Sequence, residues 1–169
     1  SDEVEILTKY LQLEQLRFQK DFTYSVTVSN SIDEDYHKIP PMLIQPIVEN
    51  SIKHGLLHQK GDKNVSVHFD IDNEETHLIC TVIDNGIGRQ KSAEIKAKNH
   101  STHNSFSTQA IEQRLELLND KLYLSDLITY SDLVSNENEV NGTKVVIKIP
   151  IVWSIWLFLH SNCNFKSMS

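Results

Sequence analysis

The chain is poor in cysteine, glycine and proline, and it has no hydrophobic run long enough to cross a membrane. Two cysteines without a paired spacing exclude a disulfide framework and a zinc ribbon, so nothing requires an oxidising compartment. The longest apolar run, over residues 151–159, is far shorter than the ~20 residues of a membrane-spanning helix. The first residues are acidic and lack the positive charge that opens a signal peptide.

Positive charge is also in deficit, since 16 Lys+Arg stand against 23 Asp+Glu and give a net charge of −7. An acidic surface repels the phosphate backbone, which excludes a general DNA- or RNA-binding protein. A local basic pocket for a small anion remains allowed. The 169 residues, 39% hydrophobic and 23% charged, are those of one ordinary globular domain.

The spacing of apolar residues predicts a first helix over residues 3–20. Leu7 and Leu11 fall on its apolar face, and we expect Leu13 and Leu16 to broaden that face.

A second helix is expected after Pro41, which suits a first helical turn. Pro46 either kinks this helix or marks a later start, and Gly55 is expected to end it at a C′ position. A third helix is predicted over residues 108–122.

Alternating apolar residues predict strands, two of which form a β-hairpin. The strands cover residues 22–29, 64–71, 77–83, 127–130 and 143–149, and the hairpin joins 64–71 to 77–83. Residues 89–107 have no firm periodicity and predict a long polar lid, and residues 131–140 predict an acidic turn. This order favours an α+β fold, a two-layer α/β sandwich whose mixed, mainly antiparallel sheet is covered by helices on one face.

The most informative segment covers residues 45–55. Its apolar residues follow one helical face and leave Glu49, Asn50, Lys53 and His54 clustered on another. The ordinary interpretation is a solvated face with a Glu49–Lys53 ion pair. The functional interpretation is a site for a metal-bound phosphate, because an amide oxygen can coordinate Mg²⁺ and lysine supplies a mobile positive charge.

Two glycine-containing segments are the other candidates. Asp84 leaves a buried strand and precedes Gly86 and Gly88, so its carboxylate can accept a hydrogen bond from an amine while the glycines let backbone approach a flat ligand. A simple turn is an equally good interpretation of that segment. Gly142 and Thr143 open the last strand, where a hydroxyl could reach a ligand or a water.

These segments, in this order, resemble the ATP-binding domain of sensor histidine kinases, which has the Bergerat fold of gyrase-type ATPases, MutL and heat-shock chaperones. The matching residues are Glu49-Asn50-x-x-Lys53-His54-Gly55, Asp84-Asn85-Gly86-x-Gly88 and Gly142-Thr143. More narrowly, residues 40–55 and the opening helix with Tyr10-Leu11-Gln12-Leu13-Glu14 resemble the LytS-like subfamily of two-component kinases. The resemblance runs from about residue 3 to Pro150.

The resemblance implies that the ligands are ATP and Mg²⁺. It implies that Asn50 holds Mg²⁺ through its side-chain oxygen, and that Lys53 and His54 lie near the phosphates and the ribose. Glu49 stands where gyrase-type relatives place a water-activating base, and in kinases this acid would instead tune the metal shell. Glu49 and Asn50 are therefore the candidate catalytic residues.

For the base, the resemblance implies that Asp84 accepts a hydrogen bond from the adenine amino group. Gly86 and Gly88 would shape the adenine pocket and the lid hinge, and Thr143 would support adenine. The implied reaction is phosphoryl transfer from ATP to a histidine, in which positioning and charge neutralisation dominate.

One departure from the family concerns its second glycine box, which precedes an Arg-Leu pair. Arg114 and Leu115 are present, but the matching glycine positions hold Ser105, Ser107 and Ala110. Serine costs more than glycine where a positive φ is needed, so the grip on the triphosphate is expected to be weaker. A degenerate, non-catalytic nucleotide-binding or dimer module is therefore an alternative.

A second departure is that no histidine here has the sequence context of the family's acceptor, which is expected on an upstream helix. This fragment alone is then expected to bind ATP without phosphorylating itself. A gyrase- or MutL-like ATP hydrolase that uses Glu49 as its base is the other alternative.

The resemblance also implies the organisation of the protein. Residues 1–20 would end a dimerisation or linker helix, and 21–150 would form the ATP-binding catalytic domain. Residues 151–169 are an apolar tail that could pack on the sheet, contact a partner chain or form an exposed, sticky segment. The implied partners are a second copy, through upstream helices, and a response regulator of LytTR type. The domain would be cytoplasmic, and the full-length protein would lie at the cytoplasmic membrane through an N-terminal region outside this chain.

Overall fold

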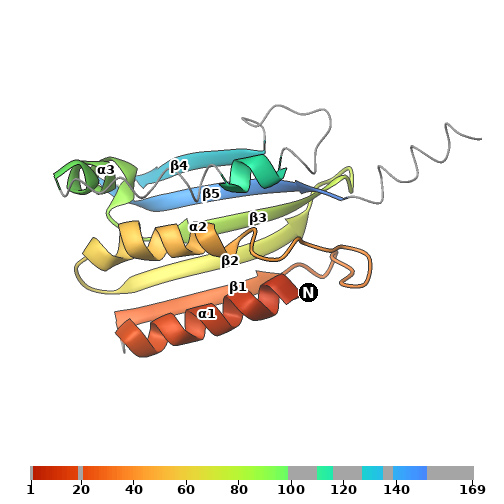
Figure 1. The fold of residues 1–169 in the computed structure, drawn as a ribbon, viewed down its shortest axis with the longest axis horizontal. Helices are drawn as coiled ribbons and strands as arrows, with labels where there is room; N and C mark the ends of the chain where they lie inside the picture. The colour runs from red at the N-terminus through yellow and green to blue at the C-terminus, as the bar shows by residue number, and fades with distance from the viewer. Residues whose placement is uncertain (1, 19–20, 99–109, 116–126, 135–138, 152–169) are drawn as a thin grey trace, which may run out of the picture.

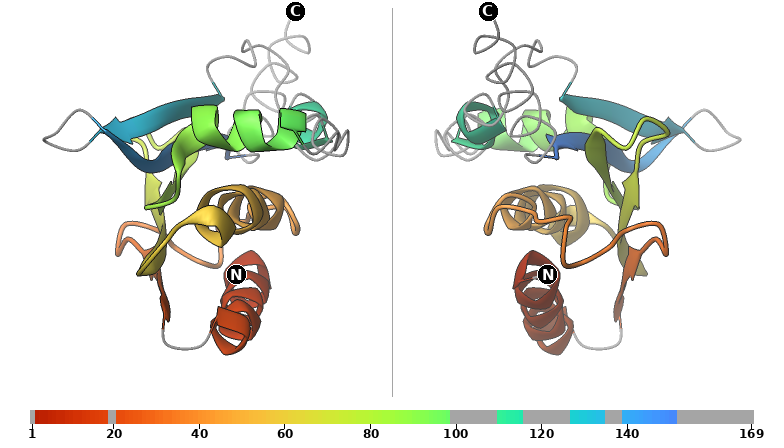
Figure 2. Two further views of the ribbon diagram at one scale, coloured as in Figure 1. Left: turned by 90° about the vertical axis from the view of Figure 1, so that its left-hand side faces the viewer. Right: turned by 90° about the vertical axis from the view of Figure 1, so that its right-hand side faces the viewer.

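The computed structural model describes residues 2–18, 21–98, 110–115, 127–134 and 139–151. One five-stranded sheet has the order β1-β2-β3-β5-β4, and the described helices cover one of its faces (Figures 1 and 2). The strands are β1 (Phe22–Val28), β2 (Lys63–Ile71), β3 (His77–Asp84), β4 (Ile128–Val134) and β5 (Val140–Pro150). The helices are α1 (Asp2–Phe18), α2 (Gln45–Asn50) and α3 (Gly88–Lys98), and residues 110–115 are also helical.

The pairing of the strands confirms the predicted α+β fold. β1 and β2 are parallel, whereas β2–β3, β3–β5 and β4–β5 are antiparallel. The predicted hairpin is formed by β2 and β3, and its register places Val65 opposite Asp84 and Ile71 opposite Leu78. The Val65–Asp84 pair therefore lies at the open end of the hairpin, and the Ile71–Leu78 pair lies next to its turn.

The core lies between the sheet and the helices. Apolar residues alternate along the strands, as a sheet with one covered face requires. The fully buried side chains include Leu7, Leu11, Ile44, Val48, Ile52, Val65, Val67, Phe69, Leu78, Cys80, Val82, Ile147 and Ile149. Cys80 is fully buried in β3, and burial raises the pKa of its thiol well above the usual value.

Helix α1 confirms the first predicted helix but has a narrower apolar face than expected. Leu7 and Leu11 are fully buried, whereas Leu13 and Leu16 are 66% and 78% exposed. The expectation that these two leucines broaden the face is wrong, because the helix contacts the domain along one stripe and they lie outside it.

Helix α2 begins where Pro46 occupies one of its first two positions, so the later of the two predicted starts is confirmed. Its orphan N–H groups are satisfied from α1, because the buried carboxylate of Glu3 accepts hydrogen bonds from the backbone of Met42, Ile44 and Gln45. The Arg114 guanidinium donates to the Met42 carbonyl from the other side (3.0 Å). The segment that leads into α2 is thus fixed by two distant parts of the chain.

The predicted acidic turn over 131–140 is wrong at both of its ends. β4 continues to Val134 and β5 already begins at Val140. Ser131 and Asp132 are polar, yet they pair with Lys144 and Thr143 in the sheet, because ladder pairing overrides a weak β-propensity.

Several predictions fall outside the described residues. These are Ser105, Ser107, most of the helix over 108–122 and the tail beyond Ile151. Ala110 is described and is exposed. Among the described residues, no helix combines the length and apolar character needed to cross a membrane.

Candidate functional site

The helix that carries the 45–55 motif changes its winding within the motif. After α2, residues Ser51–Gly55 form a π-helical turn and Leu56–His58 a 3₁₀ turn. Single π turns are rare and frequent at functional sites. The predicted stop at Gly55 is wrong, because its φ of −95° is right-handed and helical structure continues to His58.

Gly55 is instead a point of close approach between two segments. A Cβ at Gly55 would lie 3.0 Å from the Oδ1 atom of Asp84, and a Cβ at Gly86 would lie 2.5 Å from the Gly55 backbone. Two glycines therefore let the π turn rest directly on the loop that follows β3.

Asp84 ends β3 beneath this contact and is only 2% exposed. Its Oδ1 accepts the backbone N–H of Gly86 (2.9 Å), and the Ser51 hydroxyl and the Thr143 backbone also donate to this carboxylate. Burial raises the pKa of Asp84, while these three hydrogen bonds act to lower it. A buried acid with a raised pKa in a hollow is typical of a functional site.

Gly142 brings the start of β5 against Asp84. Its φ is +134°, and a Cβ there would lie 2.0 Å from the Asp84 carbonyl oxygen. Only glycine fits this contact, and it sets the register in which Thr143 lies opposite Asp84.

These elements enclose a cavity of about 230 Å³ between the π turn, α3 and strands β3, β4 and β5. Five of the residues predicted from the sequence line it together: Asn50, His54, Asp84, Gly88 and Thr143. Ile47 and Val145 add apolar wall, which suits the faces of a flat ring.

Three predicted residues do not line the cavity. The Lys53 ammonium lies 2.7 Å from Glu49 Oε2, and the other oxygen of Glu49 accepts from the Gln45 amide (3.1 Å). This is the exposed ion pair that the ordinary interpretation of the helix expects. Gly86 lies behind the wall, where it supports Asp84.

The predicted lid over 89–107 is wrong in its first part, because α3 occupies residues Gly88–Lys98. Apolar periodicity does not reveal this helix, because it has almost no apolar stripe. Its Arg, Gln, Lys, Ala and Glu residues are strong helix formers, and that propensity was the available signal. One face of α3 closes the cavity with Arg89, Ser92, Ala93 and Lys96, none of which belongs to a motif of the sequence.

Ser51 and Tyr130 also line the cavity without having been predicted. Burial raises the pKa of Tyr130, so its phenol stays neutral and able to donate a hydrogen bond. Neither residue carries a local signal in the sequence.

Arg89 closes the space between α3 and β4. Its guanidinium contacts both carboxylate oxygens of Asp132, at 3.1 and 3.2 Å. The guanidinium lowers the pKa of Asp132. The positive charge of Arg89 is thus already matched within the protein.

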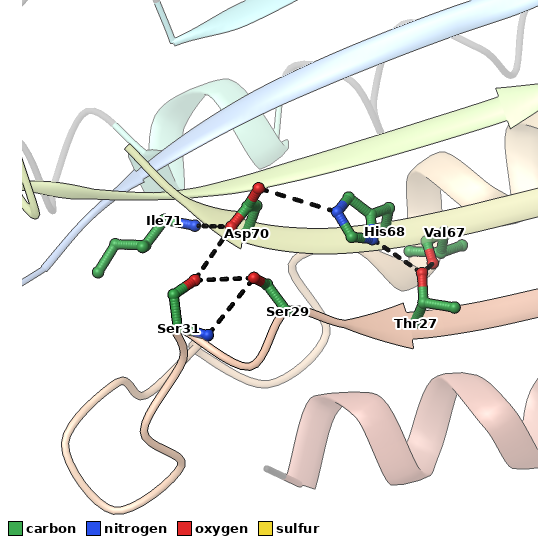
Figure 3. A network of polar contacts seen from close by, with 7 residues as sticks. All are labelled: Thr27, Ser29, Ser31, Val67, His68, Asp70 and Ile71. Carbon is green, nitrogen blue, oxygen red and sulfur yellow. Dashed lines mark hydrogen bonds and ion pairs between the residues drawn. The ribbon is translucent and has the colours of Figure 1, made fainter. Parts of the chain in front are cut away.

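A second polar cluster lies away from the cavity, where β1 and β2 end (Figure 3). Thr27 Oγ1 lies 2.8 Å from His68 Nδ1, and His68 Nε2 lies 3.9 Å from Asp70. The Ser31 hydroxyl donates to the same aspartate (3.2 Å). Although hydroxyl, imidazole and carboxylate are the groups of a catalytic triad, the His68 and Asp70 side chains are about half exposed and line no described cavity.

No protein-family model matches the chain. In sequence it is 42% identical over 86 residues to the sensor protein LytS of Staphylococcus haemolyticus, covering 51% of this chain and 14% of that protein. It is 31% identical over 150 residues to LytS of Staphylococcus saprophyticus, covering 88% of this chain and 24% of that protein. The chain therefore spans a quarter or less of the length of these two relatives.

In structure the chain is similar to the histidine kinase domain of a blue-light activated kinase from Erythrobacter litoralis EL346. The TM-score is 0.56 at 16% identity, over 88% of this chain and 60% of that one. The catalytic domain of histidine kinase ThkA, in a nucleotide-free form, gives 0.55 at 11% identity over 89% of this chain and 92% of that one. The fold is thus that of a histidine kinase catalytic domain.

The relatives in sequence narrow this class. In sequence the chain is similar to part of LytS sensor proteins, and in structure it is similar to histidine kinase catalytic domains.

Proposed function

We propose that this domain binds ATP with Mg²⁺ in the cavity and presents it for phosphoryl transfer to a histidine of a sensor kinase. One observation carries the proposal: the amide of Asn50 and the buried carboxylate of Asp84 line the same cavity, although they come from different elements. Residues 21–150 would then form the catalytic domain, and α1 the end of a linker helix.

Recognition of the base is assigned to Asp84. An ionised carboxylate offers about four lone-pair sites, and three donors of the protein occupy this one. The remaining capacity suits an exocyclic amine such as that of adenine. A carbonyl at the same place, as in guanine, would face the Asp84 carboxylate, which is also an acceptor, and would be disfavoured.

Asn50 is the residue best suited to hold Mg²⁺. Among the described residues, no group of three or more His, Cys, Asp or Glu side chains could hold a metal ion. Mg²⁺ bound to a nucleotide takes most of its ligands from phosphates and water, so one amide oxygen from the protein fits this role. When bound, the ion neutralises charge on the phosphates.

The proposed reaction is a transfer of the γ-phosphoryl group. The lone pair of an imidazole nitrogen forms a bond to the γ-phosphorus, the bond from that phosphorus to the bridging oxygen breaks, and ADP leaves with the electron pair. The N–H proton of the imidazole passes to water. The protein contributes position and charge, and a second copy and a response regulator complete the proposed pathway.

The hydrolase alternative needs Glu49 as a base facing the phosphates. Glu49 is instead engaged by Gln45 and Lys53 outside the cavity lining, so no observation favours hydrolysis over transfer. The proposed role of Glu49 is to orient the turn that carries Asn50.

Calorimetry with a non-hydrolysable ATP analogue tests this function. Wild-type protein should bind in Mg²⁺, and Asn50→Ala should weaken binding about tenfold, as expected for the loss of one charge-assisted contact. In EDTA the two proteins should bind alike, because the amide acts through the ion. Asn73→Ala, in an exposed turn, is the matched control. Failure of the wild type to bind would contradict the proposal, and equal affinity of Asn50→Ala in Mg²⁺ would remove Asn50 from it.

A further inference from the structure

The cationic side chains near the cavity differ in whether their charge is already matched. Lys53 is paired with Glu49 and lies outside the lining. Arg89 lines the cavity, but its guanidinium is held by Asp132 on both carboxylate oxygens. Neither is free to meet a ligand without first breaking an ion pair.

Lys96 is different. It lies one helical turn after Ser92 on the face of α3 that closes the cavity, and it is partly buried. Within the described part of the chain it has no hydrogen-bond or ion-pair partner. Burial lowers the pKa of its ammonium, and no carboxylate among the residues that the structure describes offsets this.

The charge of the cavity lining also favours an anionic ligand. Although the chain carries a net charge of −7, the lining holds Arg89 and Lys96 against the single carboxylate of Asp84. Since Arg89 is matched by Asp132 and Asp84 accepts three hydrogen bonds, the unmatched charge is that of Lys96. A partly buried, unmatched cation favours an anionic ligand.

We infer that Lys96 binds the polyphosphate of the nucleotide, so that α3, and not only the helix with the asparagine, supplies the phosphate site. This rests on the proposed binding of ATP. The contact with the phosphates, which the sequence motifs assigned to Lys53, is thus assigned to Lys96 of α3. Lysine suits the task, since its compact charge can follow flexible phosphates.

Calorimetry with Mg·ATP, Mg·ADP and adenosine tests the assignment on the full chain. Lys96→Gln should weaken ATP and ADP about tenfold, as expected for one charge-assisted contact, and leave adenosine within twofold. The variant should also bind ATP with a shallower dependence on salt, because one ionic contact is lost.

Two lysine variants serve as controls. Lys91→Gln makes the same charge change on an exposed position of α3 outside the cavity lining, and it should bind all three ligands like the wild type. Lys53→Gln should also retain ATP affinity within twofold. Unchanged ATP binding by Lys96→Gln, or an equal loss with adenosine, would overturn the assignment. If the wild type binds none of the three ligands, the proposed binding of ATP is wrong, and so is the role of Lys96. If only the Lys96→Gln result differs from expectation, the role of Lys96 alone is wrong.

Discussion

The two ends of the β2–β3 hairpin each hold an aspartate rich in hydrogen bonds, yet they behave in opposite ways. Asp84 is 2% exposed and its pKa is raised, because burial outweighs its hydrogen bonds. The Asp70 side chain is 47% exposed, and the Ile71 N–H, with the Ser29 and Ser31 hydroxyls, lowers its pKa (Figure 3). Desolvation therefore distinguishes the two ends, not the number of donors.

This difference in burial indicates which of the two aspartates, Asp84 or Asp70, belongs to a ligand site. Asp70 and its partners Ser31 and His68 link β2 to the end of β1. The Asp70 carboxylate is half exposed, so water already solvates its charge. At Asp84 the protein buries an acid away from water at a cost in stability, which is expected only where function requires it.

The largest effect is expected from Gly86→Ala, at the cavity end. The new Cβ would lie 2.5 Å from the Gly55 backbone. The clash is with backbone atoms, so it cannot be relieved by a change of side-chain rotamer. We expect a loss of about 3 kcal/mol in the free energy of unfolding, measured by urea denaturation, together with loss of ATP binding.

Gly61→Ala is the matched control for this substitution. Gly61, unlike Gly86, has a positive φ, +84°, and a Cβ there would meet no atom within 4 Å. Only backbone strain of about 1 kcal/mol is expected. If both variants lose the same stability, the close packing of Gly55 on Gly86 does not set the geometry of the site.

The second prediction concerns Asp84→Asn. The change replaces an acceptor by a donor at the base, so ATP binding should fall by about tenfold or more and the preference for ATP over GTP should shrink. Fluorescence titration with both nucleotides measures this. An unaltered preference would exclude Asp84 from base recognition.

The same variant should be more stable than the wild type without ligand. Because the pKa of Asp84 is raised in the folded state, its ionised form opposes folding above that pKa, and the cost vanishes below the unfolded value of about 3.9. We expect a gain of about 1 kcal/mol at pH 7 and none at pH 3, from urea denaturation at both pH values. A loss of stability at pH 7 would mean that the hydrogen bonds outweigh burial.

The sequence predicted the hairpin, the mixed sheet and five of the cavity residues because these depend on local patterns. Alternation gave β2 and β3, and the glycine segments marked where backbones approach. It failed at Leu13 and Leu16, since the width of an apolar face depends on what packs against it.

The sequence also failed on α3 and on the residues it contributes. Lys96 and Arg89 lie on a helix with no apolar stripe, and their meeting with Asn50 depends on the crossing of α3 over β5. The closing of Arg89 on Asp132 joins residues 43 positions apart, which no local pattern encodes. Helix propensity alone would have recovered the helix, but not the face that it turns to the cavity.

The smallest effect is expected from Asp70→Asn, at the exposed end of the hairpin. The pKa of Asp70 is lowered in the folded state, so its carboxylate stabilises the fold above about pH 3.9 and this contribution is lost as pH falls through the lowered value. Solvent screens the exposed side chain, and we expect less than about 0.5 kcal/mol at pH 7, no difference at pH 2, and unchanged ATP binding. Urea denaturation at both pH values, run beside Asp84→Asn, should then give shifts of opposite sign. Shifts of the same sign would show that desolvation does not distinguish the two ends.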